Sequence, residues 1–146
     1  MEYSQIDRTN CMEIILAEFP AFEAQWVVHL DSWPPIGQRP IALDIAEFAE
    51  FAIETIVTGI DAQIDRLAAI SEVILLEGDS IVEYTFRRMF LEHIAHRATK
   101  GGFSIDLFTT KLRPLGLYHW QALDRHLTID PSGIVRDDSA TADWGN

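Results

Sequence analysis

Segments with helical periodicity, separated by Pro and Gly at short intervals, constrain this chain more than any other feature. Within each segment apolar residues recur three and four positions apart, a spacing typical of amphipathic helices. No segment alternates apolar and polar residues as a strand does. The predicted helices cover residues 5–18, 20–32, 40–58, 61–77, 80–99, 104–112 and 117–128. We therefore expect an all-α fold, either a compact helical bundle or a HEAT-like α-hairpin stack of about seven short helices.

Residues that start or stop helices place the boundaries. Pro40 suits a first helical turn, and Gly59 and Gly78 suit helix ends. Asp61 is predicted to cap the helix that follows it. The segment Pro114–Gly116 is predicted to separate the last two helices.

Length favours one hydrophobic core. The chain has 146 residues, of which 48% are hydrophobic and 23% charged, as in a globular domain. We expect a single domain over residues 1–129 and a loosely held, flexible tail over 130–146, where no helical period is found. The chain opens without a secretory signal and has no apolar run long enough for a membrane span, so the cytoplasm is the expected compartment.

The third and fourth predicted helices each combine an apolar face with an acidic one, at 100° per residue. Their predicted core residues are Ile41, Ile45, Phe48, Ala49, Ala52 and Ile56 in the third helix and Ile64, Leu67, Ile70, Ile74 and Leu75 in the fourth. The opposite faces are expected to carry Asp44, Glu47, Glu50 and Glu54, and Asp61, Asp65 and Glu72. These carboxylates point away from the apolar faces, so we interpret them as a solvated surface and not as a di-metal site.

The fifth predicted helix, 80–99, is apolar on most sides, as a central helix is. Thr85, Arg88, Glu92 and His96 form its predicted polar strip, whereas His93 falls in the apolar arc. The pair His93 and His96 beside Glu92 suggests a metal site, with His29, His119 or His126 as a further ligand, but a buried and a surface histidine are expected instead.

No residue pattern points to covalent catalysis or to a cofactor. Cys11 is alone, so it forms no internal disulfide, and it is expected to be a small buried residue beside Ile14 and Ile15. The chain lacks a nucleophile elbow, a Walker loop and a dinucleotide fingerprint. We expect no enzyme activity, no cofactor and no metal. Trp26, Trp33 and Trp120 are predicted to be structural.

Charge indicates the kind of partner. The net charge is −12, and residues 1–60 hold ten acidic against two basic residues. Such a field repels nucleic acid and anionic membranes and attracts a basic protein, although acidity alone also serves solubility. Phe51 is predicted to lie among the carboxylates, either as the apolar anchor of a binding surface or as an incidental exposed residue.

Three segments resemble a known family: FPAFEAQWVVHLDSW (19–33), GDSIVEYTFRRMFLEHIAHR (78–97) and LRPLGLYHWQALDRHL (112–127). They are similar to small bacterial helical domains of unassigned activity that are found with toxin-immunity proteins. The resemblance covers most of residues 12–128. It implies a protein that protects a bacterium from a toxin, and it supplies no catalytic residues.

Charge, helix faces and resemblance together predict a cytosolic acidic binding protein. Its most specific form is an immunity protein that occludes a cognate bacterial toxin by protein–protein contact. The predicted contact residues are Glu47, Glu50, Phe51, Glu54, Asp61, Asp65 and Glu72. Two alternatives remain open, a helical metal-dependent enzyme that uses His93, His96, Glu92 and His119, and a structural adaptor.

Overall fold

The computed structural model describes residues 5–33 and 39–129, and the predicted tail over 130–146 lies outside these ranges. In chain order the elements are α1 (Cys11–Glu18), the 3-10 helix η1 (Pro20–Phe22), α2 (Glu23–Ser32), α3 (Ile41–Thr58), α4 (Asp61–Glu77), α5 (Ser80–Phe86), the π-helical turn η2 (Arg87–Leu91), α6 (Glu92–Thr99), α7 (Asp106–Thr109) and α8 (Pro114–Ile129). The predicted all-α class is confirmed.

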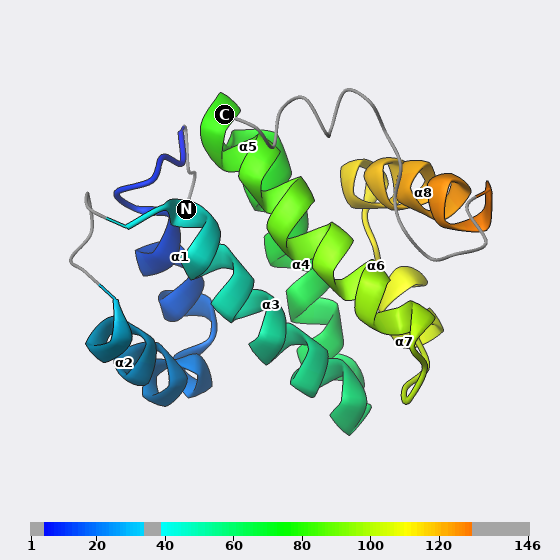
Figure 1. Ribbon diagram of the computed structural model, residues 1–146, viewed down its shortest axis with the longest axis horizontal. Helices are drawn as coiled ribbons and strands as arrows, with labels where there is room; N and C mark the ends of the chain where they lie inside the picture. Colours follow the sequence, from blue (N-terminus) through cyan, green and yellow to red (C-terminus); the bar gives the residue numbers. More distant parts are fainter. Residues whose placement is uncertain (1–4, 34–38, 130–146) are drawn as a thin grey trace.

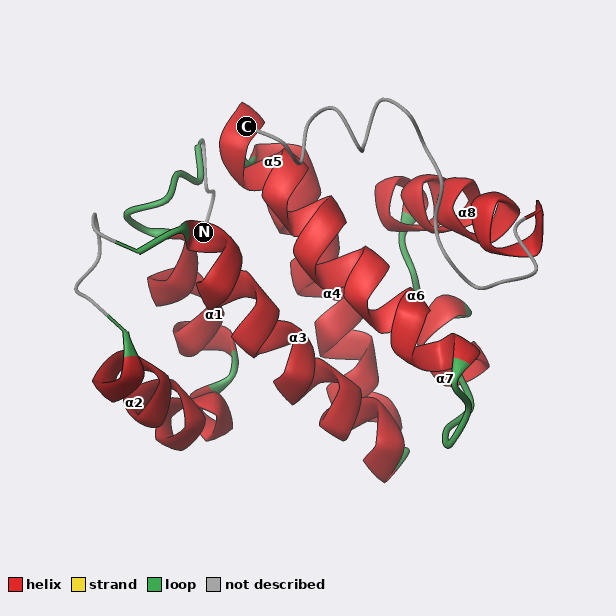
Figure 2. Cartoon of the chain, viewed as in Figure 1, coloured by secondary structure: helices red, strands yellow, loops and turns green. Residues whose placement is uncertain are grey.

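The helices form a compact bundle. Figure 1 shows α3 and the continuous helix made of α5, η2 and α6 side by side across the middle of the molecule, with α4 behind them. At one end α1 and α2 lie against α4 and α3, and at the other α7 and α8 pack on α4 and α6. Helices account for nearly all of the regular structure in Figure 2. None of them, within the described ranges, has both the length and the apolar character of a membrane span.

Aromatic rings in contact run through the core from one end of the bundle to the other. Phe22 lies 5.5 Å from Phe48, Phe48 lies 5.3 Å from Phe90, and Phe90 lies 6.5 Å from Phe108, measured between ring centroids. All four side chains are fully buried. The core faces predicted for α3 and α4 are confirmed, because every residue assigned to them is buried. The central position of the 80–99 helix follows from the same contacts.

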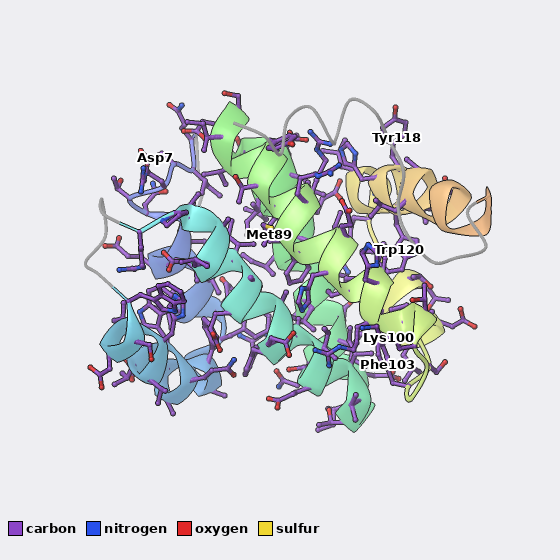
Figure 3. All side chains as sticks on the ribbon, viewed as in Figure 1. Asp7, Met89, Lys100, Phe103, Tyr118 and Trp120 are labelled. Carbon is purple, nitrogen blue, oxygen red and sulfur yellow. The ribbon has the colours of Figure 1, made fainter. Side chains whose placement is uncertain are left out.

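The tryptophans divide into two kinds. Trp26 and Trp120 are buried, as predicted, whereas Trp33 is 46% exposed, so its predicted structural role is wrong. Trp120 packs edge-on against Phe108. Figure 3 shows Tyr118 pointing outward from α8, in agreement with its exposure, with Trp120 on the side that faces α6.

The first helix begins later than predicted, at Cys11 instead of residue 5. The carboxylate of Asp7 accepts hydrogen bonds from the backbone N–H groups of Thr9 and Asn10 and from the Thr9 hydroxyl, which form a local turn in place of a helical one. These bonds also lower the pKa of Asp7. Just before this turn, Ile6 pairs in parallel with Gly78 as an isolated β-bridge.

Two other predicted helix boundaries are corrected. Ile60, and not Asp61, is the N-cap residue of α4, and no side chain caps this helix. Pro114 does not end a helix but opens α8, since proline is well suited to the first helical turn, where no N–H partner is needed. Gly59, in contrast, ends α3 as predicted, with the left-handed φ of 73° that glycine adopts without strain.

The π-helical turn changes which residues of the following helix face the core. A π turn accommodates one extra residue, so the positions after it are rotated by about 100° relative to a regular α-helix. Glu92 is accordingly buried, although it was predicted on the polar strip, and His93 is partly exposed, although it was predicted in the apolar arc. Arg88 is also mostly buried, with 11% of its side chain exposed.

Candidate partner-binding surface

The seven residues predicted to bind a partner do not form one continuous acidic surface. Four lie on α3 and three on α4, and they turn toward different neighbours. Glu47 faces α2, Glu50 faces α6, Asp61 and Asp65 face the segment before α8, and Glu72 meets the start of α8.

The two central carboxylates of α3 are engaged within the fold. Glu47 accepts a hydrogen bond from the Gln25 amide, and its Oε1 lies 3.4 Å from Nδ1 of His29. Both carboxylate oxygens of Glu50 accept from Nη2 of Arg97, at 2.9 and 2.8 Å, and His93 contacts the same carboxylate. Burial raises the pKa of Glu50, but the hydrogen bonds of His93 and Arg97 outweigh this effect and hold the pKa below its usual value.

The carboxylates of α4 hold the segment that leads into α8. Asp61 lies 3.2 Å from Nζ of Lys111, and Asp65 accepts from Nη1 of Arg113 at 2.8 Å. The Arg113 hydrogen bond lowers the pKa of Asp65. These pairs therefore reduce the negative field that the sequence predicts for this face.

Glu72 caps α8. Its two carboxylate oxygens accept from the backbone N–H groups of Leu115 and Gly116, each at 3.0 Å. These donors have no partner within the helix, and a negative charge at a helix N-terminus is favourable. Glu72 thus has a clear structural role, independent of any partner.

Asp44 is buried and not on the outward face where the helical angles place it. Its exposed fraction is 3%, and its Oδ1 accepts from Nε of Arg39 at 2.7 Å and lies 2.8 Å from Nε2 of His29. His29 stacks on Trp26 at 5.2 Å, and the Arg39 guanidinium lies over the same indole ring. This cluster attaches α2 to α3. Helical spacing could not reveal this cluster, because Arg39, which supplies the charge opposite Asp44, lies before the helix begins.

Phe51 corrects a second prediction, that of an exposed ring. Its ring lies 5.2 Å from Phe22, 6.0 Å from Phe19 and 6.1 Å from Phe48, and the side chain is only partly exposed. Phe19, directly after α1, and Phe22 in the turn η1 cover a face of this ring that α3 alone would leave exposed. Phe51 is therefore mainly a packing residue whose outer edge reaches the surface.

That outer edge lines an open groove of about 280 Å³ at the end of α3. The groove residues come from η1, from the last turns of α3 and from the start of α4: Ala21, Phe51, Glu54, Thr55, Thr58, Ile60 and Gln63. Of the predicted set, only Phe51 and Glu54 are brought together here. Glu54 is exposed and makes no hydrogen bond or ion pair with any residue that the structure describes.

Sequence patterns missed the other five groove residues, among them Ile60 and Gln63. The left-handed turn at Gly59 directs the chain from α3 into α4 and leaves Ile60 55% exposed. The exposed Val57 lies nearby in sequence on α3. The sequence feature that could have indicated this exposed residue is an apolar side chain directly after a helix-ending glycine. The groove is small for a drug-sized ligand, since such pockets span about 300–1,000 Å³, and it suits a single side chain.

The histidines and the carboxylate of the metal-enzyme alternative are spread over two sides of the α5–α6 helix. His96 lies 3.9 Å from Glu92, whereas His93 contacts Glu50 on α3 and His119 lies 3.7 Å from Glu83 on α5. In residues 5–33 and 39–129, no three His, Cys, Asp or Glu side chains are grouped as metal ligands. A histidine is buried in the core, but it is His29 and not His93, which was predicted to be there.

The fold and its surface define a small helical domain. The family model for the domain of unknown function DUF7674 matches residues 12–127, and the chain belongs to this family. No curated protein and no solved structure matches the chain.

Proposed function

We propose that this domain is a protein-binding domain whose partner is a basic protein, with the groove at the end of α3 at the centre of the contact. The observation that carries the proposal is the position of Glu54. This carboxylate has no counter-charge among the described residues, and it stands beside the partly apolar groove formed by Phe51, Ile60 and Ala21. An apolar pocket beside a charged group is the usual composition of an interface hot spot.

Long-range electrostatics supports a basic partner. The internal ion pairs cancel part of the acidity, but they do not change the net charge of −12. Exposed carboxylates are also found near the groove end of the molecule, at Glu23 in α2 and at Glu54. A field of this sign accelerates encounter with a positively charged protein and opposes nucleic acid and anionic lipid.

The most specific form of the proposal is an immunity protein that occludes a cognate bacterial toxin in the cytoplasm. The resemblance of residues 19–33, 78–97 and 112–127 to domains found with immunity proteins supports this form. Occlusion needs a complementary surface and no catalytic residue on the inhibitor, which agrees with a contact made of a carboxylate and an apolar groove. The enzyme and adaptor alternatives have no comparable observation in their favour.

The proposal is tested with two charge reversals that alter the net charge equally. Glu54→Lys changes the groove, and Glu13→Lys changes an exposed position on α1. The protein captured by the wild-type domain from its source cells is identified, and its association rate is measured over a salt series. We expect a basic partner, a rate that falls with salt, and a several-fold slower rate for Glu54→Lys than for Glu13→Lys.

Two results would contradict the proposal. An acidic partner removes the electrostatic argument, and equal rates for the two variants remove the groove from the contact. The immunity form is checked separately by expressing the captured partner in cells with and without the domain. Growth arrest by the partner that the domain does not relieve would exclude it as a toxin inhibitor.

A further inference from the structure

Arginine, an aromatic ring and a carboxylate occur together repeatedly in this fold. Four arginines have the guanidinium carbon 5.3 to 5.9 Å from a ring centroid, and each also pairs with a carboxylate. The sets are Arg39 with Trp26 and Asp44, Arg66 with Phe19 and Glu18, Arg87 with Tyr84 and Glu83, and Arg88 with Tyr84 and Glu92. The planar guanidinium stacks on a π face while its N–H groups donate to oxygen, so one side chain satisfies both neighbours.

One of these sets adjoins the groove. The Arg66 guanidinium lies 5.3 Å from the Phe19 ring, donates to the backbone carbonyl of Glu18 and lies 3.9 Å from its carboxylate. Phe19 in turn contacts Phe51 edge-on at 6.0 Å. Gln63, which lines the groove, lies three residues before Arg66 on α4, so the two surfaces are neighbours on the same helix.

The groove offers the outer edge of the Phe51 ring and the Glu54 carboxylate, and none of the described residues that line it is basic. Phe51 and Glu54 are three residues apart on α3 and therefore share a face of the helix. The hydroxyl groups of Thr55 and Thr58 donate to carbonyls of their own helix, at 2.9 and 2.6 Å. The polar groups that the groove presents to a ligand are thus chiefly the Glu54 carboxylate and the Gln63 amide.

We propose that this groove binds an arginine side chain of the partner protein, with the guanidinium at Glu54 and its apolar stem along Phe51 and Ile60. That the arginine belongs to a partner protein rests on the proposed function. That the groove binds an arginine side chain rests only on the residues that line it. Arginine fits better than lysine because its head group is planar and weakly hydrated and can donate two hydrogen bonds to one carboxylate. It is also among the residues most enriched at interface hot spots.

Small probes test the chemistry without the partner. Backbone amide shifts of the full chain are followed by NMR during titration with N-acetyl-arginine amide. The matched probes are the citrulline derivative, which keeps the shape without the charge, the lysine derivative, which keeps the charge without the plane, and the norleucine derivative, which has neither. We expect saturable shifts over residues 51–63 with the arginine probe. The citrulline and norleucine probes should bind more weakly by up to about fivefold, because they lose an exposed ion pair. The lysine probe should also bind more weakly, because it cannot pair with the carboxylate through a planar fork.

Two isosteric variants locate the site. Glu54→Gln is expected to weaken the arginine probe by about fivefold, and Glu13→Gln on α1 is expected to leave it unchanged. Equal binding of arginine and lysine, or of arginine and norleucine, would overturn the proposal, as would shifts that are insensitive to Glu54→Gln. Absence of saturable shifts over residues 51–63 would overturn it too.

The two proposals fail in different ways. A basic partner that distinguishes Glu54→Lys from Glu13→Lys, together with a groove that ignores the arginine probe, keeps the function and removes arginine from the contact. An arginine probe that binds the groove, together with the capture of an acidic partner, keeps the groove chemistry and removes the function.

Discussion

Arg39 donates a hydrogen bond from Nε to Oδ1 of Asp44 at 2.7 Å, and both side chains are almost completely buried. The pair joins the segment before α3 to the first turn of that helix, and His29 of α2 shares the same carboxylate oxygen. A buried charge that loses its partner is costly, so these three residues depend on one another. The position of α2 beside α3 is therefore maintained by charge as well as by apolar contact.

Replacing Asp44 should be among the most destabilising single changes outside the aromatic core. Asp44→Ala leaves Arg39 and His29 buried without their common acceptor, and we expect a loss of about 3–5 kcal/mol in the free energy of unfolding. Asp31→Ala, at an exposed site on α2, should change it by less than about 0.5 kcal/mol. Urea denaturation followed by circular dichroism measures both. Similar values would show that the buried cluster does not support the fold.

Phe51 should affect stability more than its surface position suggests. Phe51→Ala removes ring contacts with Phe19, Phe22 and Phe48, and we expect a loss of about 2–3 kcal/mol, below the cost of a fully buried Phe. Val57→Ala, at a residue that is 57% exposed on the same helix, serves as the control and should be nearly neutral. Thermal unfolding of the two variants decides the matter. A neutral Phe51→Ala would restore the view of Phe51 as an exposed anchor.

The capping role of Glu72 predicts a local effect. Glu72→Ala removes the acceptor for the N–H groups of Leu115 and Gly116, and a lost helix cap costs about 0.5–2 kcal/mol. Amide hydrogen exchange should accelerate in the first turn of α8 more than in α3. Glu54→Ala, which removes a carboxylate without a described partner, should leave exchange in α8 unchanged. Unaltered protection of Leu115 and Gly116 in Glu72→Ala would refute the cap.

Cys11 should be inert in the folded protein. Burial raises the pKa of its thiol to about 12, and the nearby Asp44, Asp79 and Asp7 add to this effect. The thiolate is the reactive species, so a disulfide reagent at pH 8 should modify the native protein only as it unfolds, and the urea-unfolded protein at once. Absorbance of the released chromophore follows the reaction. Immediate modification of the native protein would contradict the buried position of this side chain.

His119 predicts a loss of stability in mild acid. Burial lowers its pKa, and the charge of Arg87 lowers it further, from an ordinary value of 6.5. A lowered histidine pKa means that the unfolded chain takes up the proton first, so the contribution of His119 is fully present above pH 6.5 and declines as the pH falls below it. The His119→Gln variant should show a shallower decline over this window, measured by urea denaturation at several pH values. An NMR titration that places the His119 pKa above 6.5 would reverse the expectation.

Glu50 should make stability depend on pH over a lower range than His119 does. Its lowered pKa means that its contribution is present above the ordinary value of 4.5 and is lost as the pH falls through the pKa of the folded state. The two groups can therefore be distinguished in the same pH series.

Sequence patterns predicted the long helices and the core well because both depend on local regularities. The helix predicted over residues 104–112 is limited to Asp106–Thr109. The apolar faces of α3 and α4 follow a constant 100° per residue, and both helices are regular α-helices over their full lengths. The predicted start of α1 failed because Asp7 offers the backbone a local alternative to helical hydrogen bonds. A single side chain decides between the local turn and the helix, and the spacing of apolar residues is the same in both cases, so that spacing could not predict the outcome.

The candidate site was less predictable because its charges are settled by residues distant in sequence. Glu47 and Gln25 are 22 positions apart, and Asp65 and Arg113 are 48 apart. A helical wheel shows that a carboxylate leaves its helix on the polar side, but not which neighbour meets it there. Glu50 and Glu54 lie on the same helix, but the fold places Arg97 and His93 opposite Glu50 and no basic partner among the described residues opposite Glu54.

The π-helical turn at Arg87–Leu91 has a consequence for how this helix tolerates changes in length. A deletion of one residue here would allow a regular α-helix but would rotate α6 by about 100° about its axis relative to α5. His93 and Arg97 would then turn away from Glu50, and Glu92 would turn toward solvent. The extra residue thus sets the rotation of α6 relative to α5. A change in length here would break contacts with α3 as well as alter the helix itself.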